Sequence, residues 1–218
     1  MTKNLKRLTI ALWVLCVLVS VTVVLAYYRS RDVLAAMDAP TAAPHVVPAM
    51  APDLSTRLFP VPDFALRDEN EKPVTQQTLS GKPWIAAFIF TNCAGACPMM
   101  SKHMATLQTK IASPDVRLVS FTLDPKRDTP AVLKSYATKI GAQPGRWFFL
   151  SGTTEEMQAV ARGMLIGIGD PPEGSDQFTH SSKFLLVDGT NMVRGIYEGT
   201  SEDVLDQLAA DAEKLARE

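Results

Sequence analysis

The sequence predicts an α/β fold, a central mixed β-sheet flanked by helices, preceded by an N-terminal transmembrane helix. Strand and helix patterns alternate from about residue 61 to residue 150, and a hairpin and a helix follow. A 21-residue run without charge lies near the N-terminus. At 218 residues the chain has room for one ordinary domain plus appendages. We therefore expect an N-terminus at 1–7, an anchor at 8–28, a linker at 29–57 and a globular domain at 58–218.

The uncharged run extends from Leu8 to Tyr28. As a helix rising about 1.5 Å per residue, it spans a hydrocarbon core of roughly 30 Å. Two tyrosines and Arg29 stand where a cleaved signal peptide has small residues, so an uncleaved anchor is favoured over a cleaved signal. Lys3, Lys6 and Arg7 favour a cytoplasmic N-terminus. We expect one pass through the cytoplasmic (inner) membrane, with the domain on the outer, periplasmic side.

Charge and composition after the anchor limit the classes of partner. Residues 29–57 are rich in Ala and Pro without a helical or strand period, which predicts a linker. Residues 1–31 carry five basic groups and no acidic one, so the remainder holds 17 basic against 23 acidic residues, a net charge of −6. An acidic domain without a basic stripe argues against a nucleic-acid partner.

The first half of the domain has a β–α–β–α order. The apolar run 84–90 is typical of a fully buried strand. Pro98 suits the first turn of a helix, whose apolar face consists of Met100, Met104, Leu107 and Ile111. A strand at 116–122 leads to a helix with Thr129 as its cap and Pro130 as its first residue.

The second half completes a thioredoxin-like pattern. A strand is expected at 146–150, and Thr153-Thr-Glu-Glu156 is a capping box that begins another helix. Segments 184–187 and 192–197 form a hairpin around Asp188-Gly189, and an amphipathic helix at 201–217 closes the domain. This order matches a thioredoxin-like layered sheet, whose site is expected at the carboxyl end of the first buried strand.

Two cysteines lie at that position. Cys93 and Cys97 are separated by Ala-Gly-Ala between the buried strand and the helix at Pro98. The positive end of the helix dipole predicts that Cys97 is favoured as a thiolate. A helical spacer would place the two residues about 5–6 Å apart, which suits a disulfide or two sulfurs on one metal. A purely structural disulfide is the simpler alternative, but so short a ring removes little unfolded-state entropy.

A third ligand decides what the pair binds. Two thiolates select Cu(I), and an added imidazole lets a site hold copper in either oxidation state. The candidates are His103, six residues past Cys97 and about 120° off its helical face, and His180, just before the hairpin strand. Residue spacing alone does not choose between them. The cluster Met99, Met100, His103 and Met104 on the same helix could be mistaken for a second copper site. Core filling explains Met100 and Met104 more simply, because they share the apolar face of the helix.

Three blocks of the sequence resemble the Sco/SenC family: Cys93 to Pro98, Ser120 to Pro130, and Thr179 to Asp188. The resemblance implies a thioredoxin fold that binds one copper ion, Cu(I) or Cu(II), through Cys93, Cys97 and His180. It further implies delivery of copper to the copper A site of cytochrome c oxidase, or reduction of that site's cysteines. The implied partners are the copper A subunit of the oxidase and a thiol reductant protein.

The resemblance also raises points outside the ligand set. Asp124 matches an aspartate near the family's site, where it either orients a ligand or partner or begins the turn before Pro125. Family members commonly carry acidic residues at the positions of Thr179 and Gly95. Neither position is a ligand, but lower negative charge there would alter copper affinity or the redox potential of the cysteine pair.

Three functions fit these features. The first is a copper metallochaperone without catalytic turnover. The second is an enzyme, a membrane-anchored thiol-disulfide oxidoreductase in which Cys93 and Cys97 cycle on exported protein cysteines. The third is a peroxiredoxin-like peroxidase, suggested by Val61-Pro-Asp-Phe and Thr91-Asn-Cys93. Of these three functions, only the copper metallochaperone requires a histidine ligand such as His180, so we favour the metallochaperone.

Overall fold

The computed structural model describes residues 13, 21–22, 52–164, 168–169, 179–180 and 182–218. The chain divides into two units, residues 1–49 and 50–218. The predicted N-terminus (1–7), nearly all of the predicted anchor (8–28) and residues 29–51 of the predicted linker (29–57) lie outside the described residues. Cys16, which belongs to the predicted anchor, and His45, which belongs to the predicted linker, are among them. Within the described residues, no helix has the length and apolar character needed to cross a membrane.

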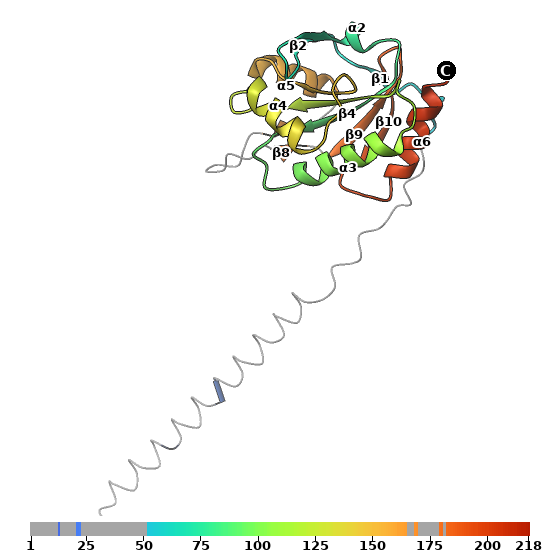
Figure 1. Cartoon of the computed structure of the whole chain (residues 1–218). Helices are drawn as coiled ribbons and strands as arrows, with labels where there is room; N and C mark the ends of the chain where they lie inside the picture. The colour runs from blue at the N-terminus through green and yellow to red at the C-terminus, as the bar shows by residue number, and fades with distance from the viewer. Residues whose placement is uncertain (1–12, 14–20, 23–51, 165–167, 170–178, 181) are drawn as a thin grey trace, which may run out of the picture. The chain divides into compact units, whose positions relative to one another are not determined.

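The second unit is built on a six-stranded mixed sheet (Figure 1). Its strand order is β1-β10-β9-β4-β5-β6. Strands β4, β5 and β6 run parallel, whereas β9, β10 and β1 pair antiparallel, so the predicted mixed sheet is confirmed. The bounds are Phe59–Pro60 (β1), Trp84–Ile89 (β4), Arg117–Thr122 (β5), Trp147–Leu150 (β6), Lys183–Val187 (β9) and Met192–Glu198 (β10).

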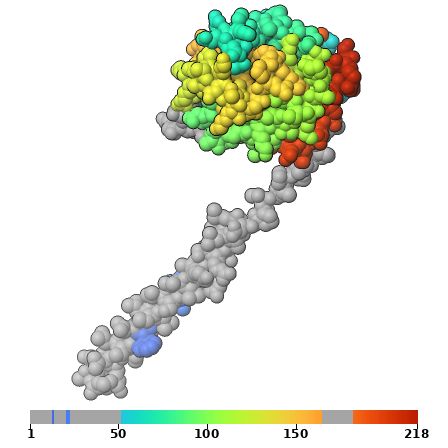
Figure 2. All heavy atoms as spheres, viewed as in Figure 1, coloured from blue at the N-terminus to red at the C-terminus, as the bar shows by residue number. Residues whose placement is uncertain are grey.

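Helices cover this sheet. The four longer ones are α3 (Cys97–Lys110), α4 (Pro130–Lys139), α5 (Thr154–Gly163) and α6 (Leu205–Leu215). Right-handed crossovers between successive parallel strands place α3 and α4 on the same face. The Tyr136 hydroxyl of α4 donates to Ser101 of α3 across 2.7 Å. On its other side α3 contacts α6, and the two lie next to each other in Figures 1 and 2.

A small layer that the sequence pattern revealed only in part covers the opposite face. It consists of β2 (Ala65–Arg67), β3 (Pro73–Thr75) and the one-turn helix α2 (Gln76–Leu79). The short strand after residue 61 was predicted, whereas β3 and α2 were missed because such short elements show no period. Beneath this layer the Phe64 ring meets Phe121 edge-on at 5.7 Å, and Phe121 stacks on Phe88 at 5.0 Å.

The core follows the predicted pattern closely. All six residues of β4 are buried, as are the four apolar residues of α3 and its end, Met100, Met104, Leu107 and Ile111. Core filling by these methionines is therefore confirmed. The side chains of Thr129 and Thr153 cap α4 and α5 as expected, and Thr153 forms the predicted capping box with Glu156.

Three boundaries differ from expectation. Helix α3 begins at Cys97 rather than Pro98, and α6 begins at Leu205 rather than Ser201. Leu54 lies within the predicted linker but is buried, and its carbonyl accepts hydrogen bonds from Arg194. The packed unit therefore includes residues ahead of 58, because a long-range contact captures a segment without any period of its own.

Candidate metal centre

The two cysteines lie at the carboxyl end of β4, where the sequence placed them. The loop between Ile89 and Cys97 carries Cys93, and Cys97 is the first residue of α3. Neither Cys93 nor Cys97 forms a disulfide in this structure. Cys93 is half-buried, whereas Cys97 is only 1% exposed. The pair is therefore asymmetric, with one sulfur reachable from solvent and the other in the core.

The spacer brings the two side chains into hydrogen-bond contact without forming a helical turn. Residues 94–96 bend, and the helix starts only at Cys97. The Gly95 amide donates to the Cys93 sulfur across 3.3 Å. The Cys97 thiol in turn is hydrogen-bonded to Cys93. Two sulfurs this close, with a backbone amide directed at one of them, form a soft donor pair suited to a single metal ion.

The prediction that Cys97 is favoured as a thiolate is wrong for this hydrogen-bonded dithiol. Burial first, and the hydrogen bond with Cys93 second, raise the pKa of Cys97 to about 12, although backbone hydrogen bonds at Phe90 and Cys97 act in the opposite direction. Desolvation of a charged sulfur thus outweighs the favourable field of the helix N-terminus. Helix position alone gave the wrong sign because it says nothing about burial.

His180 lies just ahead of the hairpin strand β9, as predicted, and it belongs to a short strand pair that the sequence pattern did not predict. Strand β8 (Thr179–His180) pairs antiparallel with β7 (Ile168–Gly169), and β9 follows it. The structure describes the backbone of His180, but its side chain lies outside the described part. Figure 1 shows β8 at the same edge of the domain as the start of α3.

Hydrogen bonds fix the chain just after His180 to the rest of the domain. The carbonyl of Ser182 accepts from the Gly199 amide at 2.7 Å, and the Ser182 hydroxyl donates to Glu198 at 2.7 Å. The Gly199 carbonyl contacts Nδ1 of His103 on α3 at 2.8 Å. His103 therefore links the helix that begins at Cys97 to the segment that follows His180. It is buried and engaged with the main chain, in keeping with a structural role.

Asp124 begins a turn. Its carbonyl accepts from the amides of Arg127 and Asp128, and its carboxylate accepts from Arg127 at 3.1 Å. The turn role expected from the sequence is confirmed, whereas orientation of a ligand or partner stays a prediction. Met99, by contrast with the buried methionines of α3, is exposed beside the cysteines.

Sequence reasoning missed one buried residue beside the cysteine loop, Asp128. It is fully buried and accepts hydrogen bonds from Thr91, two residues before Cys93, and from Thr122 at the end of β5. The signal available in the sequence was an aspartate directly before the Thr129 cap, which by itself suggests only a helix start.

The described side chains contain no group of three His, Cys, Asp or Glu residues arranged to hold a metal. They supply two of the three predicted ligands, Cys93 and Cys97. Taken together, a mixed sheet, a dithiol at a strand-to-helix junction, and a closing hairpin and helix define a thioredoxin-like domain with a two-sulfur site.

Comparison with known proteins narrows this class. The SCO1/SenC family model matches residues 54–217, and the chain belongs to that family. It is 35% identical to the SCO1 protein homolog of Bacillus subtilis over 161 residues, which is 72% of this chain and 83% of that protein.

Two solved structures are also similar. One is BsSco, described as a member of the Sco family of cytochrome c oxidase assembly proteins with a disulfide switch; the TM-score is 0.66 at 34% identity, covering 74% of this chain and 96% of that one. The other is Arabidopsis thaliana ScoI with copper bound, with a TM-score of 0.62 at 28% identity, covering 72% and 97%.

Proposed function

We propose that this protein is a membrane-anchored copper metallochaperone. It binds one copper ion through Cys93, Cys97 and His180, and it delivers the ion to the copper A site of cytochrome c oxidase or keeps the thiols of that site reduced. The observation that carries the proposal is the hydrogen-bonded pair of Cys93 and Cys97 at the β4–α3 junction of a SCO1/SenC chain. Copper is cargo here, and the protein holds it only between donor and acceptor.

The chemistry of the donor set supports copper. Two adjacent thiols are soft ligands that prefer Cu(I), and they must lose their protons on binding, so binding releases protons. A neutral imidazole from His180 would complete a set able to hold Cu(II) as well. The relative of known structure from Arabidopsis thaliana, ScoI, has copper bound.

The asymmetry of the sulfurs supports transfer rather than storage. Cys93 is accessible, so an incoming thiol of a partner can approach the copper from that side, while buried Cys97 keeps its hold. Exchange of ligands one at a time avoids a free copper ion.

Copper titration of the reduced full chain in detergent tests the ligand set, with Cys16→Ser as the background so that only the site thiols react. We expect one copper per chain, lost in Cys93→Ser and in Cys97→Ser. His180→Ala should weaken Cu(II) binding and leave the disulfide free to form, whereas the matched control His103→Ala should keep full copper. Stoichiometric copper in both cysteine variants would refute the assignment.

Thiol-disulfide exchange on exported protein cysteines is the second candidate. The exposed Cys93 and buried Cys97 suit attack and resolution respectively, and BsSco is described as having a disulfide switch. Two assays separate thiol exchange from copper delivery: reduction of an oxidised copper A fragment by the copper-free protein, and transfer of copper from the loaded protein to the reduced fragment. An oxidoreductase loses the reducing activity in Cys93→Ser and keeps it in His180→Ala, whereas copper delivery requires all three residues.

The proposed topology places the domain outside the cytoplasmic membrane, with residues 8–28 as the anchor. A membrane-impermeant thiol reagent on intact cells should then label Cys93 and Cys97 after external reduction, while Cys16 stays unlabelled. Protection of the pair until the cells are lysed would place the domain in the cytoplasm.

A further inference from the structure

Asp128 ties together three segments that surround the cysteine loop. Its Oδ1 accepts from the Thr91 hydroxyl at 2.5 Å, and its Oδ2 accepts from the Thr91 amide at 3.1 Å and from the Thr122 hydroxyl at 2.5 Å. Thr91 follows β4, Thr122 ends β5, and Asp128 itself directly precedes α4. One side chain thus fixes the ends of two neighbouring parallel strands relative to a helix.

These contacts determine where the cysteine loop starts. Thr91 stands two residues before Cys93, and the other end of the loop is set by α3, where the Met100 amide donates to Ala96. Only residues 92–96 lie between the two fixed points. With so few residues, a shift at Thr91 must change the position of Cys93 relative to Cys97.

The carboxyl group also lies in the same neighbourhood as the sulfurs. Burial raises the pKa of Tyr136 and the hydrogen bond to Ser101 lowers it, while the smaller electrostatic effects of Cys97, Cys93 and Asp128 raise it. The described residues form no ion pair with Asp128, so neutral threonines hold it. Such a group fixes the loop without placing a cation next to the thiols.

We propose that Asp128, acting through Thr91, is a positioning residue that favours the reduced dithiol of Cys93 and Cys97 over their disulfide. Disulfides require a narrow range of Cα and Cβ separations, so a loop held in the dithiol arrangement resists closing. The inference rests on the proposed function, in which only the dithiol can receive copper. It adds a mechanism that keeps the pair ready for copper in an oxidising compartment.

The equilibrium with glutathione measures this preference in the absence of copper. Oxidised glutathione accepts two electrons and two protons from the two thiols, which yields the Cys93–Cys97 disulfide and two reduced glutathione molecules. We use the full chain in detergent on the Cys16→Ser background. Thr91→Val removes the hydroxyl without changing charge, and Thr91→Ser keeps it.

We expect Thr91→Val to shift this equilibrium toward the disulfide by about tenfold, which corresponds to about 30 mV. Thr91→Ser should match the unsubstituted protein. Asp128→Asn should shift it in the same direction, and the double variant should shift it no further than the larger single change, because both release one contact. Tyr197→Phe, which loses a buried hydrogen bond to Asp211 instead, should cost stability without moving the equilibrium.

A Thr91→Val equilibrium within twofold of the unsubstituted protein, or additive effects in the double variant, would overturn the inference. If Asp128→Asn does not fold, comparison of Thr91→Val with Thr91→Ser still shows whether the Thr91 hydroxyl affects the dithiol–disulfide equilibrium. Failure of the proposed function looks different, since the unsubstituted protein would then bind no copper when reduced, whatever the Thr91 variants show.

Discussion

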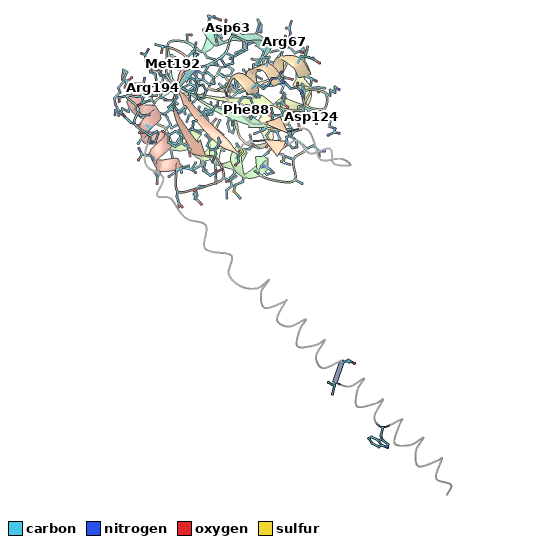
Figure 3. All side chains as sticks on the ribbon, turned by 180° about the vertical axis from the view of Figure 1, so that it is seen from behind. Asp63, Arg67, Phe88, Asp124, Met192 and Arg194 are labelled. Atoms are coloured by element: carbon cyan, nitrogen blue, oxygen red, sulfur yellow. The ribbon has the colours of Figure 1, made fainter. Side chains whose placement is uncertain are left out.

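Two buried carboxyl groups lie at opposite ends of the central sheet, and they accept hydrogen bonds from different kinds of donor: neutral hydroxyl groups at one end and a guanidinium at the other. Asp128 lies beyond the carboxyl end of β4 and accepts from Thr91 and Thr122. Asp188 follows β9, whose last residue pairs with the first of β4, so it lies at the other end. There Arg194 donates to Asp188 at 2.7 Å. Figure 3 labels Arg194 and Asp124, the start of the Asp128 turn, at opposite sides of the domain.

The difference follows from what lies nearby. Arg194 also donates to the carbonyl of Leu54, so the ion pair with Asp188 fastens the first packed residues to β10. A guanidinium is suited to that task because it is always charged and carries several donors. Beside the cysteines, a cation would favour thiolates and compete with a metal ion. Neutral hydroxyl groups fix the loop there without that effect.

The largest expected effect is at the Asp188 end. Arg194→Ala leaves a carboxylate buried without its partner, which typically costs about 3–5 kcal/mol in the free energy of unfolding. Urea unfolding measures this loss, and copper binding by the folded fraction should be unchanged. A loss of less than about 1 kcal/mol in the free energy of unfolding is typical of an exposed ion pair. Such a result would mean that the Arg194–Asp188 pair does not stabilise its end of the sheet as a buried ion pair does.

Removing one hydroxyl at each end provides a matched comparison. Thr122→Val takes a donor from fully buried Asp128 and an acceptor from the Asp124 amide, at an expected cost of about 1–3 kcal/mol. Thr190→Val removes one of several donors to Asp188 at an exposed position, at about 0.5–1.5 kcal/mol. Equal losses in urea unfolding would contradict the stronger dependence of Asp128 on neutral donors.

The variant His103→Ala tests whether a histidine near the cysteines also binds copper. His103→Ala leaves the Gly199 carbonyl without its buried partner, so we expect a loss of about 1–3 kcal/mol in the free energy of unfolding. Copper stoichiometry should stay at one per chain. Loss of copper from a fully folded variant, judged by circular dichroism, would make the helix histidine a ligand and contradict the assignment of His180.

The smallest effect concerns acid stability near the site. Although burial opposes ionisation, hydrogen bonds from Lys183, Ser182 and Thr200 lower the pKa of Glu198 from 4.5 to about 2. A lowered pKa in the folded state means that the stabilisation is complete above about pH 4.5 and is lost as the pH falls toward 2. Glu198→Gln should therefore flatten the fall of stability in this window, measured by urea unfolding at each pH. An unchanged slope would exclude a contribution from Glu198.

Much of the domain was predictable because its signals are local. The buried strand at 84–89 is a continuous apolar run, and Thr129 and Thr153 cap helices through contacts three residues away. The position of Cys93 and Cys97 between that strand and a helix was likewise visible. The elements that sequence reasoning missed are too short to produce a periodic pattern: β1, β3, α2, β7 and β8.

The order of the longer strands and helices, the apolar face of α3 and the location of the two thiols could be predicted from the sequence, because each depends on residues within a few positions of one another. Tertiary packing buries Cys97, which reverses the expected effect of the helix dipole on the pKa of its thiol. It also decided the contacts of Asp128 with Thr91, His103 with Gly199 and Arg194 with Leu54, which join positions 37, 96 and 140 residues apart. Such pairs form because the sheet order brings distant segments together, and buried polar groups must then find partners there.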